Sequence, residues 1–171
     1  MSLDLSLAPA GGSGHDMFLH VKSNGSAIKG EARDDQHQDE IEVFGWSWGM
    51  ESKSAAGANA PISKRTLREL NILKKVDAAS VPLMMAMSTN ARIEAVLTLR
   101  KAGKSRHEYL KITLKQGRIT SFDVRTGDQV GDATVVERLS FSFQKIMVDY
   151  VPQGDDGMPK GGMSFEDQTS A

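Results

Sequence analysis

The amino-acid sequence predicts a mainly β fold, a sandwich or barrel that carries one short α-helix. Most of the chain between its ends consists of extended segments, rich in β-branched and aromatic residues and separated by turn signals. Only one segment is rich in unbranched helix formers. The last long extended segment changes its buried face partway along, as strands do at the corners of barrels. A doubly wound α/β fold needs several helices and is therefore excluded.

The first part of the chain predicts two strands separated by a loop. Met17–Val21 begins the first strand, and Asn24-Gly25 supplies a turn after it. The segment Glu31–Glu42 carries six carboxylates against one arginine, has no periodicity and is predicted to be a loop. From Phe44 to Met50, bulky residues alternate with small ones, which indicates a strand with one bulky and one small face. We expect Trp46 and Trp48 to be buried, so that the small residues Gly45, Ser47 and Gly49 face the other way.

The middle of the chain predicts a loop, a strand and the helix. Ser52–Ser63 consists mostly of Gly, Ala, Ser, Asn and Pro, is long for a hairpin connection and is expected to be exposed. Extended structure resumes at Thr66–Leu73. Asp77–Ser88 predicts a helix of about two to three turns, with Ser80 as its N-cap. Methionine fills irregular apolar gaps, so the methionine cluster of this helix is expected to pack in the core.

Four later strands complete the predicted barrel: Ile93–Lys101, His107–Gln116, Ile119–Arg125 and Thr134–Val151. In the last of them the apolar residues change parity, which requires a bulge or bend near Gln144-Lys145. We expect residues 1–15 to form a flexible N-terminal extension, residues 16–152 the barrel domain, and residues 153–171 a C-terminal tail.

The composition excludes several classes of function. The 171 residues include no cysteine, so there is no disulfide, thiol nucleophile or cysteine-ligated metal. The 21 basic and 22 acidic side chains nearly cancel, and aromatic residues are not interleaved with the basic strands, which disfavours a nucleic-acid partner. No apolar run is long enough to span a membrane, and the first residues lack the basic start and apolar stretch of a signal peptide. We therefore expect a cytoplasmic product that leaves the cell, if at all, by another route.

Two motifs suggest chemistry but fit it poorly. Gly45–Gly49 matches G-x-S-x-G, and Ser47, Asp77 and His107 follow in the triad order of α/β-hydrolases. That motif needs a sharp strand-to-helix turn, whereas here it lies within an alternating strand. A small serine hydrolase is therefore an alternative, as is a monomeric ligand-binding β-barrel. The second motif is a cluster of four acidic residues and one histidine: Asp34, Asp35, His37, Asp39 and Glu40. Its spacing fits neither an EF-hand loop nor a zinc-binding helix, so we predict no metal and no cofactor there.

Charge is unevenly distributed along the chain. Arg100–Arg118 holds seven basic residues and one glutamate, and Lys64–Lys75 holds five basic residues and one glutamate. The loop Glu31–Glu42 and the end of the chain have the opposite sign. Complementary patches on one chain predict a head-to-tail association between copies.

A series of short motifs then resembles one family. The chain is similar over about Asp16–Gln153 to Hcp, the haemolysin-coregulated protein of bacterial type VI secretion. The similarity rests on these segments in this order: Asp16–Leu19, Ile28–Glu31, Glu40–Val43, Trp46–Gly49, Leu70–Asp77, Pro82–Met85, Leu97–Gly103, Glu108–Ile112 and Asp149–Gln153. The sequence departs from the family in the extension ahead of Asp16 and in the turn Arg125–Asp132.

The resemblance implies a two-sheet β-barrel with one short α-helix on its side, and a structural protein rather than an enzyme. It implies homohexameric rings that stack into a tube inside a contractile sheath, end at a spike of the VgrG type and hold small effector proteins. It also implies secretion through that machine. By this resemblance, Gly45, Ser47 and Gly49 line the ring lumen. It places the contact between stacked rings in a loop that contains Ser52, Ala55, Gly57, Asn59, Ser63, Lys64 and Arg65.

Overall fold

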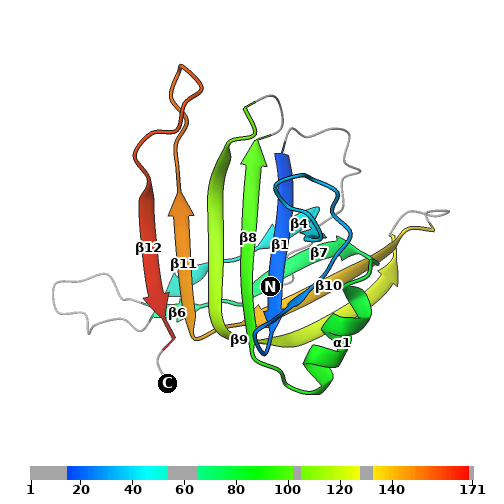
Figure 1. The fold of residues 1–171 in the computed structure, drawn as a ribbon. Helices are drawn as coiled ribbons and strands as arrows, with labels where there is room; N and C mark the ends of the chain where they lie inside the picture. The colour runs from blue at the N-terminus through cyan, green and yellow to red at the C-terminus, as the bar shows by residue number, and fades with distance from the viewer. Residues whose placement is uncertain (1–14, 54–64, 102–104, 128–132, 170–171) are drawn as a thin grey trace.

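The computed structural model describes residues 15–53, 65–101, 105–127 and 133–169, and these form a mainly β domain (Figure 1). Its elements are β1 (His15–Ser23), β2 (Ser26–Ile28), β3 (Ile41–Glu42), β4 (Gly45–Ser47), β5 (Met50–Ser52), β6 (Arg65–Leu67), β7 (Leu70–Lys75), α1 (Ser80–Ser88), β8 (Ile93–Lys101), β9 (Glu108–Thr126), β10 (Val135–Ser142), β11 (Lys145–Tyr150) and β12 (Met163–Gln168). The prediction of a mainly β fold with one short helix is confirmed.

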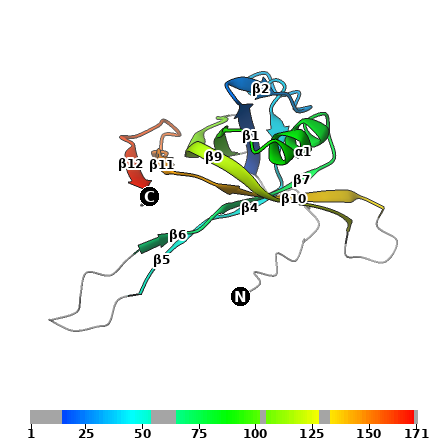
Figure 2. The ribbon, with the colours of Figure 1, turned by 90° about the horizontal axis from the view of Figure 1, so that it is seen from below.

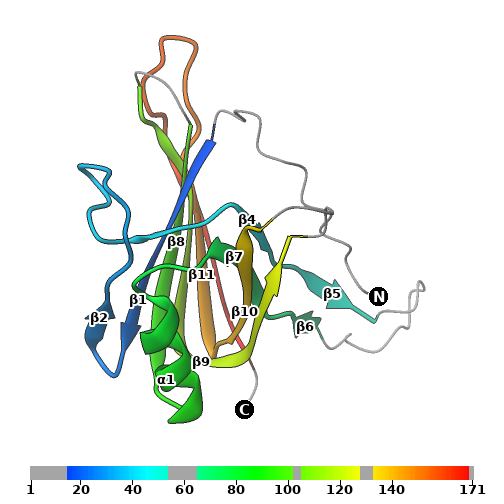
Figure 3. The ribbon, with the colours of Figure 1, turned by 90° about the vertical axis from the view of Figure 1, so that its right-hand side faces the viewer.

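Apart from β5 and β6, which pair only with each other, the strands form two sheets that share β9. The first sheet has the order β2-β1-β8-β9-β11-β12, and the second has the order β9-β10-β7-β4; all pairs are antiparallel. The strands of the second sheet cross behind those of the first (Figures 1 and 3). β9 is therefore one long strand where the sequence predicted two.

Two bends let strands pass from one sheet to the other. β9 bends at Gln116 and Gly117, where Gln116 has a φ of 52° and a Cβ on Gly117 would lie 2.6 Å from the carbonyl oxygen of Ser142. The chain bends again between β10 and β11, at Phe143-Gln144. The change in apolar parity thus predicted this second bend correctly, because Phe143 and Ile146 are both buried although they have opposite parity.

The opposite side of the barrel is closed by the segment Ile41–Ser47. Its start, β3, pairs with β1 in the first sheet, and its end, β4, pairs with β7 in the second sheet. Between them, the amide of Val43 donates to the carbonyl of Met17 and the amide of Phe44 donates to the carbonyl of Leu73. The enclosed core is aliphatic and aromatic, with fully buried side chains that include Leu19, Ile41, Leu70, Ile72, Leu83, Leu97, Ile112, Leu114, Leu139 and Phe141.

The helix differs from its prediction in two ways. Ser80 begins α1 but is not its N-cap: that position is Ala79, which makes no side-chain cap, and the Ser80 hydroxyl instead donates to the buried carboxylate of Glu137. The helix buries Ser80, Leu83 and Ala86. Met84, Met85 and Met87 are exposed, so the expectation that the methionines pack in the core is wrong for these three.

Two further features were not evident from the sequence. The strand predicted at Phe44–Met50 is interrupted, and its second part, β5, pairs with β6 as a hairpin that projects from the body (Figure 2). Met163–Gln168, in the segment whose composition suggested a tail, forms β12 along the edge of the first sheet. Within the described residues, no helix has the length and apolar character needed to span a membrane.

Candidate functional site

The second sheet has a polar face opposite the core. Three pairings place Ser47 beside Asn71, Asn71 beside Ser140, and Ser140 beside Ser121. These four residues form one row of small polar side chains across β4, β7, β10 and β9, and we call it the polar row. Within it, the Ser140 hydroxyl donates to the side-chain carbonyl of Asn71 at 2.7 Å.

The adjacent row shows why the polar row faces outward. Trp46, Ile72, Leu139 and Phe122 are paired across the same four strands. Ile72 and Leu139 are fully buried, and the rings of Trp46 and Phe122 pack against the core. Successive side chains of a strand point to opposite faces, so Ser47 and its neighbours in the polar row lie on the face away from the core.

The two glycines beside Ser47 leave room for larger side chains. A Cβ on Gly45 would lie 2.9 Å from Cδ1 of Leu73, and a Cβ on Gly49 would lie 2.1 Å from the guanidinium of Arg68. A side chain at Gly45 would therefore require Leu73 to move, and one at Gly49 would require the flexible end of Arg68 to move. The small face predicted for this segment is partly a packing requirement of β7 and of the turn into the hairpin.

The three residues of the alternative hydrolase reading are not assembled into a triad. The carboxylate of Asp77 accepts from Nζ of Lys74 at 2.8 Å, and Nε2 of His107 lies 2.7 Å from the carbonyl oxygen of Val151. Neither group hydrogen-bonds to the other or to Ser47, and Ser47 lies on a regular strand beside Asn71. Asp77 and His107 therefore do not provide Ser47 with a general base.

The acidic loop lies against the outer side of the first sheet and is neutralised there. Arg100 is buried and donates to Asp34 and Asp16, with its closest nitrogen–oxygen distances 2.6 and 2.9 Å. The hydrogen bond from Arg100 holds the pKa of the Asp34 carboxyl far below its usual range, and the same bond raises the pKa of Arg100. Asp35 pairs with Arg106 at the loop's outer edge.

His37 anchors the same loop to the first sheet. Its ring stacks on Phe18 with a centroid distance of 4.4 Å, its Nδ1 lies 2.9 Å from Glu40, and its Nε2 lies 2.7 Å from Glu108. Among the residues that the structure describes, no group of three metal-ligating side chains could hold an ion.

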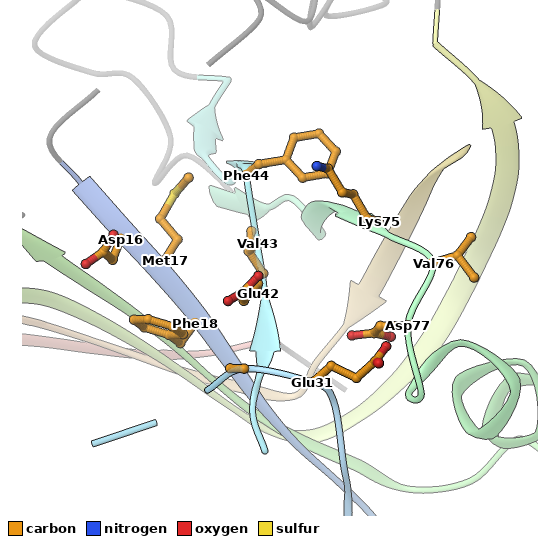
Figure 4. Close-up of a pocket in the computed structure, with 11 residues that line it drawn as sticks. Asp16, Met17, Phe18, Glu31, Glu42, Val43, Phe44, Lys75, Val76 and Asp77 are labelled. Carbon is orange, nitrogen blue, oxygen red and sulfur yellow. The ribbon is translucent and has the colours of Figure 1, made fainter. Parts of the chain in front are cut away.

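A hollow of about 520 Å³ opens where the start of β1 faces the end of β7 (Figure 4). Its carboxylates mostly support the fold: Asp16 binds Arg100, Asp77 binds Lys74, and Glu31 accepts from the amide of Ala78 at 2.9 Å. No serine, cysteine or histidine is among its lining residues, which are Asp16, Met17, Phe18, Glu31, Ala32, Glu42, Val43, Phe44, Lys75, Val76 and Asp77. Three of its four carboxylates are thus engaged in contacts that hold β1, β7, β8 and the start of α1 in place.

The predicted stacking loop is described only at its two ends. Ser52 ends β5 and is exposed, and Arg65 begins β6, where its guanidinium binds the carboxylate of Asp167 on β12. This hydrogen bond lowers the pKa of Asp167 and raises that of Arg65. The remaining positions of that prediction lie outside the described residues: Ala55, Gly57, Asn59, Ser63 and Lys64.

Sequence reasoning identified one of the four residues of the polar row. Ser47 was singled out, whereas Asn71, Ser121 and Ser140 were not. Asn71 and Ser140 each alternate with buried residues along their strands, so a period-two reading of β7 and β10 would have placed them on the outer face. Ser121 has the same parity as the buried Ile119, and the register shifts between them, so β9 gave no such signal. Their alignment in one row depends on strand register, which the sequence does not give.

Comparisons with known proteins agree on one family. The model of the family described as "Type VI secretion system effector, Hcp" matches residues 18–150. The chain is 37% identical over 151 residues to Protein hcp1 of Pseudomonas aeruginosa, which covers 86% of this chain and 90% of the relative. The structure of Hcp1 from Salmonella typhimurium superposes with a TM-score of 0.69 at 27% identity and covers 91% of this chain and 95% of that one. A type VI secretion system effector from Yersinia pestis gives a TM-score of 0.65 at 26% identity, with coverage of 88% and 99%.

Proposed function

The chain belongs to the Hcp family, the structural tube proteins of type VI secretion, which are not enzymes. We propose that it forms closed hexameric rings. In this proposal the rings stack into the inner tube, and the polar row faces a lumen that carries small effector proteins. The observation that carries the proposal is the second sheet, whose inner face is packed in the core and whose other face presents Ser47, Asn71, Ser140 and Ser121 in one row.

Both edges of the second sheet are available for another copy. β4 pairs with β7 on one side, and residues 119–124 of β9 pair with β10 on one side; no described strand lies on the other side of either segment. Unpaired edges are templates for strand addition. If the β4 edge of one copy meets the β9 edge of the next, the contact is head-to-tail and closes by rotation into a ring. The lumen would then be lined by the second sheets of all copies.

The charge argument for association is weaker than the sequence suggested. Much of the acidic loop is paired within the chain, since Asp34 binds Arg100, Asp35 binds Arg106, and Asp39 lies 3.7 Å from Lys29. The loop folds over the end of β8 and the turn before β9, so its carboxylates meet Arg100 and Arg106 of the same chain. The ring contact therefore has to rely chiefly on strand edges and apolar surface.

The remaining parts of the proposal come from the family. We infer a cytoplasmic protein that is secreted through the type VI machine without a signal peptide. Its partners would be other copies in stacked rings, a spike protein of the VgrG type, the contractile sheath and small effectors, with neither nucleic acid nor membrane insertion. The segment Ser52–Ser63 joins the projecting strands β5 and β6 and would reach the neighbouring ring. Ordering such a loop costs about 1–2 kcal/mol per residue, so stacking would be weak.

The proposal is tested first by assembly and then by cargo. Native mass spectrometry and electron microscopy of the purified protein should show six-copy rings, whereas a monomer at micromolar concentration would support the ligand-binding barrel instead. Ser47→Gln should leave the number of copies per ring unchanged because no core volume changes, and it should weaken retention of a co-expressed effector. The matched control is Ser164→Gln, an exposed position on β12. Unfolding by Ser47→Gln would show that Ser47 is packed in the core.

A further inference from the structure

The exposed apolar side chains of this domain are concentrated on two flanks. On α1, Val81, Met84, Met85 and Met87 are exposed, and Met85 exposes 62% of its surface. We call these four residues the helix patch. α1 carries no charged residue between Ser80 and Ser88, and it buries only its opposite side against the barrel. Contiguous exposed apolar surface of this kind marks interaction sites.

The second flank is the free end of the first sheet. Tyr150 of β11 is paired with Met163 of β12, and Val148 is paired with Phe165. These four residues, the edge patch, lie on the same face as the buried Ile146 and so continue the core face outward. Val148 still packs against the core, whereas Tyr150, Phe165 and Met163 are exposed, Met163 by 63%. The face of the first sheet that packs in the core thus continues onto β11 and β12, where no part of the same chain covers its apolar side chains among the described residues.

The two patches lie on opposite flanks of the domain. In Figure 2, β11 and β12 are on one side, above the diverging β5–β6 hairpin, and α1 lies on the other side. Neither patch needs a charged partner. α1 is uncharged, and the one carboxylate on the inner face of β12, Asp167, is already bound by Arg65. Each patch can therefore be desolvated without burying an unpaired charge.

We propose that the helix patch of one copy packs on the edge patch of the next copy. This inference rests on the proposed ring and names a contact within it. A second copy is the occupant because the chain itself supplies both surfaces on opposite flanks, as a head-to-tail ring requires. The chemistry also matches, since methionine sulfur packs favourably against aromatic rings such as Phe165 and Tyr150. The contact lies beside the proposed β4–β9 edge pairing, because α1 packs on β9 and Arg65, at the start of β6, binds Asp167 of β12.

The absence of cysteine from the sequence permits a direct test. In the double variant Met85→Cys/Met163→Cys, oxidation or a short bis-maleimide should cross-link neighbouring copies covalently. Denaturing gel electrophoresis should then show a ladder of cross-linked species that ends at six copies. A disulfide requires close approach of the two Cβ atoms, so bridging reports contact. The matched control is Met85→Cys/Arg33→Cys, because Arg33 is exposed on the loop over the other face of the first sheet. Each single-cysteine variant should give no ladder.

A second measurement does not depend on bridging geometry. Met85→Glu places a charge on an exposed position, so the fold should be retained by circular dichroism, and the ring dissociation constant should rise by at least about tenfold. If the wild type forms rings but the double-cysteine variant gives no cross-linked ladder, the contact is overturned and the ring proposal stands. The same holds if Met85→Glu leaves the ring dissociation constant unchanged. Dimers from Met85→Cys alone would indicate a helix-to-helix contact and overturn it too. A wild-type chain that stays monomeric would overturn both proposals.

Discussion

Lys74 and Glu137 form a fully buried ion pair that ties the second sheet to the start of α1. They are direct cross-strand neighbours in β7 and β10, both side chains are 0% exposed, and Nζ lies 2.5 Å from Oε2. Nζ also lies 3.2 Å from the hydroxyl of Ser80 and 2.8 Å from the carboxylate of Asp77. Lys74→Met would leave the Glu137 charge buried with Ser80 as its remaining donor. Breaking a buried pair in this way costs about 3–5 kcal/mol, a large share of a typical domain stability of about 5–15 kcal/mol.

The double variant Lys74→Met/Glu137→Leu should recover most of that loss. It removes both charges, and among the described residues Oε1 of Glu137 has no hydrogen-bond partner, so the pair is incompletely satisfied in the wild type. The assay is urea unfolding at one fixed protein concentration, followed by circular dichroism and analysed as a double-mutant cycle. Lys75→Met, at the exposed next position, is the control and should change stability by less than about 0.5 kcal/mol. A single-variant loss below about 1 kcal/mol, or a double variant no better than the single one, would refute this reasoning.

Three further outcomes follow from the same structure. Asp34→Asn should lower the free energy of unfolding by about 1–3 kcal/mol at neutral pH, because Arg100 loses a charged acceptor. The pKa of Asp34 is lowered in the folded state, so unfolding measured at several pH values should show the difference from wild type shrinking below about pH 4. Gly117→Ala should lower the stability by about 1–3 kcal/mol in thermal unfolding, because its Cβ meets the carbonyl of Ser142, and an unchanged melting temperature would show that the bend can relax. Replacing residues 55–60 by two glycines should preserve the rings and abolish secretion from cells; normal secretion with visible tubes would show that the loop is a passive connector.

Local patterns in the sequence predicted most of the strands and one of the bends. The alternation of bulky and small residues from Phe44 to Met50 indicated a two-faced strand, and this holds over β4, although the strand is interrupted at Trp48 and Gly49. The change of parity before Ile146 predicted the bend between β10 and β11, because an apolar residue on each side of the bend has to reach the same core. In both cases the information lies within a few consecutive residues.

Other elements required the tertiary structure. β12 is a strand because its backbone pairs with β11, and its own side chains are largely exposed, so its composition gave no strand signal. The methionines of α1 were expected in the core because methionine commonly fills irregular apolar gaps. The structure instead buries the small residues Ser80 and Ala86 with Leu83, so that the helix packs close to the barrel and leaves its methionines outside.

By itself, the sequence determined the mainly β class, the position of the helix, the family and the outward direction of Ser47. Only the tertiary structure decided that Ser47 stands in a row with Asn71, Ser140 and Ser121, and that Arg100 binds Asp34 of the Glu31–Glu42 loop. Periodicity and turn signals act over a few residues and can be read along the chain. Register and ion pairing join residues that are far apart in sequence, and these are settled when the two sheets close around one core.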